Sequence, residues 1–240
     1  MKIAPDVWLS EQLERSVYKV TFEPSGESFD PQGLLKQGHV FAFTRIPVHD
    51  LRAIEWLEEH GFHLVDTNVV FEIEAERLAD ELPQDETVKF CFAAPEHEEG
   101  AVSVARENFR YSRFHIDPHI PVQMANNIKA AWVRNFFRGQ RGDQMVVAIA
   151  DGKVAGFNQV LYKGDGKLRI DLIATDHRFR NRGFAKQMVI YGARQISGVK
   201  QVIVGTQVTN VPSVRLYESM GFRLTEADYL FHYHYDSDGA

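Results

Sequence analysis

The stretch HRFRNRGFAKQM, residues 177–188, gathers three arginines and a lysine around one glycine, and it follows the strand-like run LRIDLIAT. A helical pattern begins at Gly183. The first amides of a helix lack intrahelical partners and carry the positive end of its dipole, so this turn can hold an anion. Arg180 and Arg182 add charge at one point, which suits a pyrophosphate better than a long polyanion. The alternative is an arginine-rich solvated loop before an ordinary amphipathic helix.

A second segment, NVPSVRLYESMGF, follows the strand-like run QVIVGTQV. It places Asn210 after the strand, Ser213 at a helix N-terminus, Tyr217 one turn into the helix, and Gly221 and Phe222 at its end. A phenol with a pKa near ~10 can protonate a departing thiolate. Tyr217 is therefore a candidate general acid, and the alternative is a packing aromatic with a satisfied hydroxyl.

The two segments, in this order and each after a strand, resemble the GNAT superfamily of acyl-CoA-dependent N-acetyltransferases over roughly residues 87–235. The family's cofactor loop, Arg/Gln-x-x-Gly-x-Gly/Ala, is matched by Arg180, Gly183 and Ala185. The resemblance implies acetyl-CoA as co-substrate, with its pantetheine arm paired to a strand edge and its pyrophosphate on the loop amides. The implied cofactor residues are Leu172, Ile173, Thr175, Arg180, Asn181, Arg182, Gly183, Phe184, Ala185, Lys186, Asn210, Ser213 and Tyr217.

A narrower resemblance is to acetyltransferases that act on the amine of a nucleotide-linked deoxyamino sugar, of which dTDP-fucosamine acetyltransferase is the best-known type. It rests on YSRFHIDPHIP, AAWVRNFFRGQRGD, GFNQV and IDLIA, and on an N-terminal segment that ends in AIEWLEEHGFHLVDTNVVFEI. Members usually begin with Trp-Asp-Ser and then Phe-Gly, whereas VWLSEQLERSVYKV keeps the tryptophan and lacks Phe-Gly. Because the N-terminal half helps to shape the acceptor pocket in these enzymes, the missing Phe-Gly affects the expected identity of the sugar more than the expected reaction.

Acetyl transfer to an amine needs a neutral nucleophile, an oxyanion donor and a proton for the thiolate. Tyr217 would supply the proton, and a strand amide near Ile173 would stabilise the oxyanion. Asp66 is the first candidate for the general base, because the enzymes resembled here carry a carboxylate at that position; its alternative is a turn or strand-edge carboxylate. His115 is the second candidate, since imidazole titrates near neutrality.

The elements that must position these residues show a weak internal repeat between residues 56–73 and 216–233, each reading as helix, Gly-Phe, strand. A polar linker is expected at 78–87, and a further helix over 125–139. Antiparallel-type strands then pass into alternating strands and helices. We therefore expect an α/β layered GNAT fold with a mixed, mostly antiparallel sheet, made of an N-terminal partial GNAT-like half-domain (1–80) and an acetyltransferase domain (81–240).

Net charge, hydrophobicity and cysteine content limit the kinds of partner and compartment that we expect. A net charge of -6 gives no overall attraction to nucleic acid. No stretch reaches the ~18 apolar residues of a membrane span, and the single Cys91 favours a reducing compartment, so a cytoplasmic protein is expected. His232 and His234 share one strand face as a metal pair would, but the sequence offers no third ligand close by, and no metal is expected.

The leading hypothesis is acetyl-CoA-dependent N-acetylation of a small primary amine, with a nucleotide amino sugar as the narrower version. Acetylation of a protein or peptide, or of another small amine, is the alternative within the superfamily, and a non-catalytic acyl-CoA-binding module is the alternative outside it. Exposed strand edges make a homodimer plausible.

Overall fold

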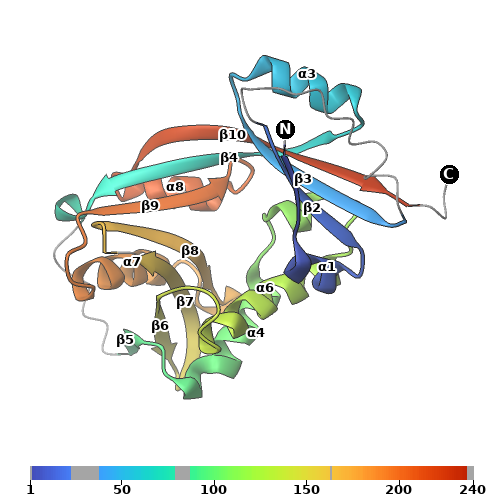
Figure 1. The fold of residues 1–240 in the computed structure, drawn as a ribbon. Helices are drawn as coiled ribbons and strands as arrows, with labels where there is room; N and C mark the ends of the chain where they lie inside the picture. The colour runs from blue at the N-terminus through green and yellow to red at the C-terminus, as the bar shows by residue number, and fades with distance from the viewer. Residues whose placement is uncertain (1, 23–37, 79–86, 163, 237–240) are drawn as a thin grey trace.

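The computed structural model describes residues 2–22, 38–78, 87–162 and 164–236, in which ten strands form one sheet in the order β1-β2-β3-β10-β4-β9-β8-β7-β6-β5 (Figure 1). The strands are β1 (Lys2–Pro5), β2 (Ser16–Thr21), β3 (Val40–Pro47), β4 (His63–Glu74), β5 (Val88–Phe92), β6 (Gln144–Ala150), β7 (Lys153–Tyr162), β8 (Lys167–Thr175), β9 (Gln201–Gln207) and β10 (Arg223–Tyr235). Among these, β2 with β3 and β8 with β9 run parallel and the other neighbours antiparallel. The predicted mixed, mostly antiparallel sheet is confirmed.

Helices cover both faces of this sheet. They are α1 (Val7–Leu13), α3 (Leu51–Glu59), α4 (Glu98–Asn108), α5 (Arg113–Ile116), α6 (Val122–Phe137), α7 (Phe184–Gln195) and α8 (Val211–Ser219). The helix expected over 125–139 is α6, which begins three residues earlier because Pro121 stands at its N-cap. No described helix is long and apolar enough to cross a membrane.

The internal repeat appears as two structural copies. Helix α3 ends at Glu59 with His60 as its C-cap, Gly61 takes a left-handed φ of 78°, and β4 follows. Helix α8 ends at Ser219 with Met220 as its C-cap, Gly221 has a φ of 86°, and β10 follows. Glycine allows this sharp exit from each helix because it pays no steric cost at positive φ. The two long strands then pair with each other, antiparallel.

The N-terminal and C-terminal parts of the chain share the sheet. Strand β10 lies between β3 and β4, and β4 also pairs with β9. On one face, α1 packs against α6, where the rings of Trp8 and Trp132 stack with centroids 5.8 Å apart. The expected boundary at residue 80 and nearly all of the linker 78–87 lie outside the described residues, so the division into two domains stays a prediction.

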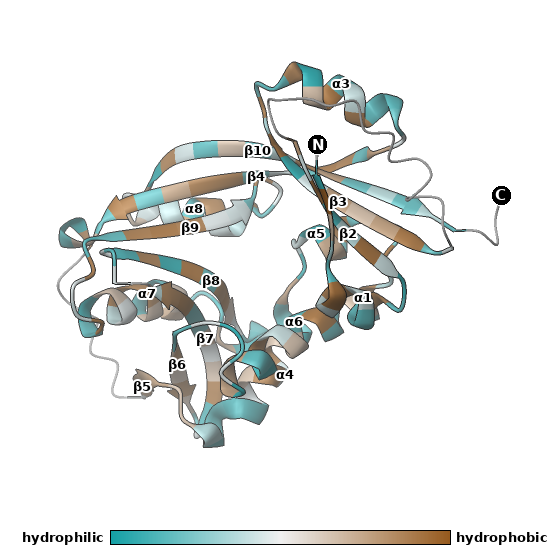
Figure 2. Ribbon diagram, in the orientation of Figure 1, coloured by the Kyte–Doolittle hydropathy of each residue, from teal (hydrophilic) through white to brown (hydrophobic). Residues whose placement is uncertain are grey.

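The C-terminal part is layered around β6, β7 and β8. Helices α4 and α6 pack on one face, with Phe157 and Leu172 in the shared core, and α7 packs on the other face through Phe184 and Met188. Figure 2 shows the hydrophobic run along β9 and the middle of β4, which lie near the centre of the sheet. Helix α7 begins at the end of this buried core, so its N-terminus is held at a fixed place beside β8.

Candidate active site

The sheet opens between β8 and β9. The two strands pair in parallel from Lys167 with Gln201 to Ile170 with Val204, and their pairing stops there although β8 continues to Thr175. Beyond that point each strand keeps its outer neighbour, β7 for β8 and β4 for β9. The separation begins at Asp171, where the register of β8 against β7 shifts by one residue. A bulge at this position bends the strand, which leaves one edge of β8 unpaired.

The backbone groups on this free edge can be assigned from the β7 register. The Asp176 amide donates to the Ala155 carbonyl, and in an antiparallel ladder every second residue bonds to the same neighbour. The amides of Ile173 and Thr175 therefore face away from β7, toward the gap. In agreement, the Thr175 carbonyl accepts a 3.4 Å hydrogen bond from Arg180 Nε instead of a strand amide. This edge can accept an extended ligand arm as an additional strand.

Helix α7 starts at the end of the same gap. Its N-cap, Gly183, has a left-handed φ of 76°, and Asn181 just before it has a φ of 63°. A Cβ on Gly183 would meet only the far end of the Gln187 side chain at 3.9 Å, so the space in front of the helix amides is open. Open amides at a helix N-terminus form an anion site. This is the local structure that the sequence predicts here.

A cavity of about 1040 Å³ joins the β8–β9 gap to this helix N-terminus and extends under the N-terminal strands. Most of the sequence-predicted residues line it: Leu172, Ile173, Thr175, Arg180, Asn181, Gly183, Phe184, Ala185, Lys186, Asn210, Ser213 and Tyr217. Arg182 is outside this lining, and its guanidinium lies over the Phe179 ring, 5.4 Å from the centroid. Arg180 is partly engaged, because its Nη2 donates to the Asn108 carbonyl and side chain at 3.3 Å.

Tyr217 lies at the floor of the cavity. Its side chain is 1% exposed and its ring packs on Phe222 and Phe71, with centroids 5.4 Å and 6.1 Å away. Burial raises the pKa of this phenol well above its usual value, which keeps the hydroxyl protonated across the neutral range. A protonated phenol can donate and cannot accept a proton as a base.

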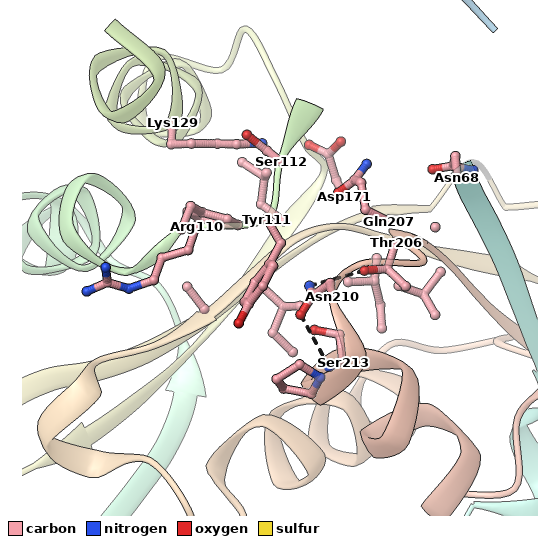
Figure 3. A pocket seen from close by; sticks show the side chains of 18 of the residues that line it. Asn68, Arg110, Tyr111, Ser112, Lys129, Asp171, Thr206, Gln207, Asn210 and Ser213 are labelled. Atoms are coloured by element: carbon pink, nitrogen blue, oxygen red, sulfur yellow. Dashed lines mark hydrogen bonds between the residues drawn. The ribbon is translucent and has the colours of Figure 1, made fainter. Parts of the chain in front are cut away.

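Asn210 and Ser213 lie where β9 passes into α8, opposite Lys129 and Ser112 (Figure 3). The Asn210 Oδ1 accepts from the Ser213 amide at 3.4 Å, so Asn210 caps the helix, and its Nδ2 donates to Thr206 Oγ1 at 3.2 Å. These bonds hold the turn rigidly against the cavity.

Asp66 does not line the cavity. The Thr209 hydroxyl donates to its Oδ2, and the Thr67 amide donates to its Oδ1 at 2.6 Å. The side chain is 5% exposed. It nevertheless lies beside the site, because its register partner on β10, Leu230, is a cavity residue, and Thr209 precedes Asn210.

His115 also lies outside the lining and is held by two bonds. Its Nε2 donates to Asn126 Oδ1 at 3.0 Å, so its Nδ1 accepts from the Ser112 hydroxyl at 2.6 Å. Burial lowers the pKa of His115, which leaves the imidazole neutral near pH 7. Ser112 itself faces the cavity (Figure 3), so His115 reaches the cavity through that hydroxyl.

Lys129 is a cavity residue that sequence reasoning missed. It lies on the buried face of α6, 6% exposed, with Nζ 4.9 Å from the Phe109 ring centroid. Burial, together with the nearby Arg141 and Arg113, lowers its pKa to about 7. The sequence did contain a signal for this residue, because Lys129, in the run KAAWV, falls on the apolar face of the predicted helix.

Asp171 is the second missed residue. Both of its oxygens accept from Arg141, at 2.8 Å each, and Oδ2 also accepts from Gln159 at 2.8 Å. The pairing holds the carboxylate of the bulge in place at the cavity wall. The signal in the sequence was a single acidic residue inside the apolar run IDLIA.

The cavity wall is strongly basic. Among the described residues that line it, Asp171 is the one carboxylate, while the cations are Lys19, Arg45, Arg110, Arg113, Lys129, Arg141, Arg169, Arg180 and Lys186. Arg113 is held over the Phe43 ring at 3.8 Å, and burial lowers its pKa to about 9. Three buried polar atoms on the wall have no partner within the described structure: Thr44 Oγ1, Asn68 Nδ2 and Thr175 Oγ1. A wall of this kind suits an anionic ligand with several hydrogen-bonding groups.

The open β8 edge, the free helix N-terminus and the buried tyrosine are the features that the sequence predicts for an acyltransferase site of the GNAT type. The sequence profile of the Acetyltransferase (GNAT) family matches residues 101–222, and the chain belongs to this family. The fold and the enzyme class that the sequence predicts are thereby confirmed.

The chain is similar to several known proteins. It is 27% identical to the spore coat polysaccharide biosynthesis protein SpsD of Bacillus subtilis (strain 168) over 94% of this chain and 80% of that protein. It is 27% identical to the N-acetylaspartate synthetase of Homo sapiens over 48% of this chain and 38% of that protein. Among solved structures, a conserved protein of unknown function from Staphylococcus epidermidis matches 91% of this chain and 83% of its own, with a TM-score of 0.66 and 15% identity, which shows the common fold.

Proposed function

We propose that this enzyme transfers an acetyl group from acetyl-CoA to the primary amine of a small anionic acceptor, and that the acceptor is a nucleotide-linked deoxyamino sugar. The observation that best supports this proposal is one continuous cavity, which has the open β8 edge and the α7 N-terminus at one end and many basic side chains at the other. The family generally uses acetyl-CoA, and SpsD, similar along nearly the whole chain, is named for polysaccharide biosynthesis.

The donor end fits acetyl-CoA. When bound, this co-substrate supplies the acetyl group. The free edge of β8 at Ile173 and Thr175 offers backbone pairing for an extended pantetheine arm. The open amides at Gly183, with Lys186 on the next turn, offer donors for a pyrophosphate.

The acceptor end lies under the N-terminal strands. Arg45 and Lys19 come from β3 and β2, Arg169 comes from β8, and Arg113 comes from α5. Their guanidinium and ammonium groups suit the diphosphate of a nucleotide sugar, because arginine pairs with phosphate in a bidentate geometry. The unpartnered Thr44 hydroxyl and Asn68 amide, on β3 and β4, suit sugar hydroxyls.

The reaction follows from the residues at the junction of the two ends. The Ile173 amide faces the gap and donates to the carbonyl oxygen of the acetyl group, which stabilises negative charge there. Tyr217 donates its proton to the departing sulfur. The amine loses its proton to a general base, for which Asp66 and His115 remain our two candidates. His115 contacts the lining residue Ser112, so its proton would pass through that hydroxyl, whereas Asp66 contacts Thr209 behind the lining, so its proton would pass through water.

The test follows free thiol release from acetyl-CoA in the presence of candidate amines. The panel contains a dTDP-linked amino sugar, the same amino sugar without the nucleotide diphosphate, aspartate, a polyamine and a lysine peptide. We expect the nucleotide-linked sugar to give a kcat/KM at least about tenfold above that of the free sugar. Equal values for the two sugars would overturn the nucleotide-linked acceptor, and a faster reaction with aspartate or the peptide would name the other acceptor class.

A further inference from the structure

Three imidazoles share one face of the sheet away from the acyl-donor gap. His232 and His234 are two residues apart on β10 and therefore point to the same side. The register of β10 against β4 places His63 directly opposite His232. Backbone pairing alone thus brings His63 beside the two histidines that the sequence marks as a pair.

A carboxylate from the segment after α5 enters this group. Asp117 is 2% exposed, and its Oδ2 lies 2.5 Å from His232 Nδ1, 2.8 Å from His234 Nε2 and 4.0 Å from His63 Nε2. Its Oδ1 accepts from the His119 amide at 2.8 Å. Asp117 thus supplies a ligand that the sequence around His232 and His234 lacks, from more than 100 residues before β10 in the chain.

Two ring nitrogens in the group are buried without a hydrogen-bond partner, His63 Nε2 and His234 Nδ1. Buried imidazole nitrogens are normally satisfied, so the unpartnered His63 Nε2, 4.0 Å from Asp117 Oδ2, points to a missing ligand beside the carboxylate that His234 Nε2 also faces. One ligand atom from each of His63, Asp117 and His234 lies within 4.8 Å of the others. Donors on a tetrahedral zinc ion with bonds of 2.0–2.2 Å are roughly 3.3 Å apart, so small side-chain rotations bring these atoms into range.

His232 has a different position in the group. Its Nε2 faces Arg113 Nη1 at 3.4 Å, and a guanidinium can only donate, so Nε2 accepts and Nδ1 carries the proton that bonds Asp117. His232 is fully buried and orients the Asp117 carboxylate, as outer hydrogen bonds do for metal-ligating carboxylates.

We propose that His63, Asp117 and His234 bind a divalent transition-metal ion with Zn²⁺ as the best chemical match, and that His232 orients the carboxylate. Two imidazoles and one carboxylate are a donor set for zinc, whereas Ca²⁺ and Mg²⁺ prefer oxygen ligands. The His119 ring, whose centroid is 4.9 Å from that of His234, borders the same space and can supply a fourth ligand. The ion would join β4 and β10 to the segment that follows α5. Helix α5 begins with Arg113, one of the basic residues at the acceptor end of the cavity.

The test is calorimetric titration of ZnCl₂ into the full chain after treatment with a chelator. We expect one high-affinity Zn²⁺ per chain, no binding of MgCl₂ at the same concentrations, and a higher melting temperature with zinc. His63→Ala and His234→Ala should each weaken zinc binding by about 10-fold to 100-fold or more. His49→Ala, which removes an exposed histidine outside the group, is the matched control and should bind like the native chain.

His63 is partly exposed at the start of β4, with 39% of its side chain accessible, so its truncation should leave the fold intact. A circular dichroism spectrum checks this, and His234→Ala gives a second, independent removal of a ligand. No high-affinity zinc binding by the native chain would overturn the proposal. Equal zinc affinity of the folded His63→Ala and His49→Ala variants would overturn it as well, since the ion would then be bound elsewhere.

Discussion

The ammonium group of Lys129 lies over the indole of Trp132, with Nζ 4.4 Å from the ring centroid. The aromatic face favours the charged lysine, but burial and two neighbouring arginines outweigh it and lower the pKa to about 7. In the unfolded chain the amine titrates near its ordinary value of ~10.4. Between about pH 7 and ~10.4 the unfolded chain therefore binds a proton that the folded chain does not.

Stability should consequently rise with pH in this window, by at most about 1.4 kcal/mol per pH unit from this group. Denaturant unfolding at pH 6, 7, 8 and 9 measures the effect in the native chain and in Lys129→Gln. The difference in the free energy of unfolding between the two should change in favour of the native chain above pH 7 and stay flat below it. Parallel curves for the two proteins would show that Lys129 is protonated in the fold.

Tyr217→Phe should preserve the fold and acetyl-CoA binding, because the ring contacts with Phe71 and Phe222 remain. The variant lacks only the hydroxyl that we propose as the proton donor to the sulfur. We expect kcat to fall by about 10²-fold to 10³-fold with little change in the Kd for acetyl-CoA, measured by thiol release and calorimetry. An unchanged kcat would remove Tyr217 from the proton transfer and leave it as a packing residue.

Gly183→Val should weaken acetyl-CoA binding more than Arg180→Ala or Arg182→Ala does. The valine is strained at a φ of 76° and places its side chain in front of the helix amides, whereas each arginine adds only peripheral charge. We expect at least about a tenfold higher Kd for the glycine variant.

Gly152→Val is the control for this comparison. Gly152 has a φ of 69° and equally open surroundings, but it lies in the β6–β7 turn outside the cavity lining. It separates backbone strain from the loss of the anion site. If Arg180→Ala proves the most damaging variant, the binding free energy resides in the side chains rather than in the amides.

The two candidate bases can be separated by pH profiles of kcat/KM for Asp66→Asn and His115→Ala. The true base must be deprotonated, so its removal should abolish the ascending limb. The other variant should retain that limb at a lower or equal rate. If both variants keep the limb unchanged, neither residue is the base, and Lys129, with its pKa near 7, becomes the group to replace next.

Local patterns predicted the local structure around Gly183 and Asn210 well. The turn before Gly183 and the Asn210 cap depend on neighbours within a few residues, and strand-helix spacing is sufficient to place them. The helix, glycine and strand of each repeat were equally predictable, because Gly61 and Gly221 end their helices through backbone geometry alone.

The basic residues at the acceptor end of the cavity could not be predicted in the same way. Arg45, Arg113 and Arg169 come from three separate elements that meet only through the order of strands in the sheet. Asp66 illustrates the same difficulty, since its position one residue behind the cavity depends on the β4–β10 register and its bulge. Asp117 reaches His63 and His232 through long-range contacts that no local spacing encodes.

The position of β10 between β3 and β4 also determines when these strands can pair during synthesis of the chain. Both neighbours lie within the first 74 residues, whereas β10 ends at Tyr235. On the ribosome, β3 and β4 therefore emerge with open edges, and these edges stay unpaired until β10 (Arg223–Tyr235) has been synthesised. Such long-range closure is slow and leaves strand edges available for wrong pairings. Nascent chains of this enzyme should accordingly depend on chaperones until β10 has emerged from the ribosome.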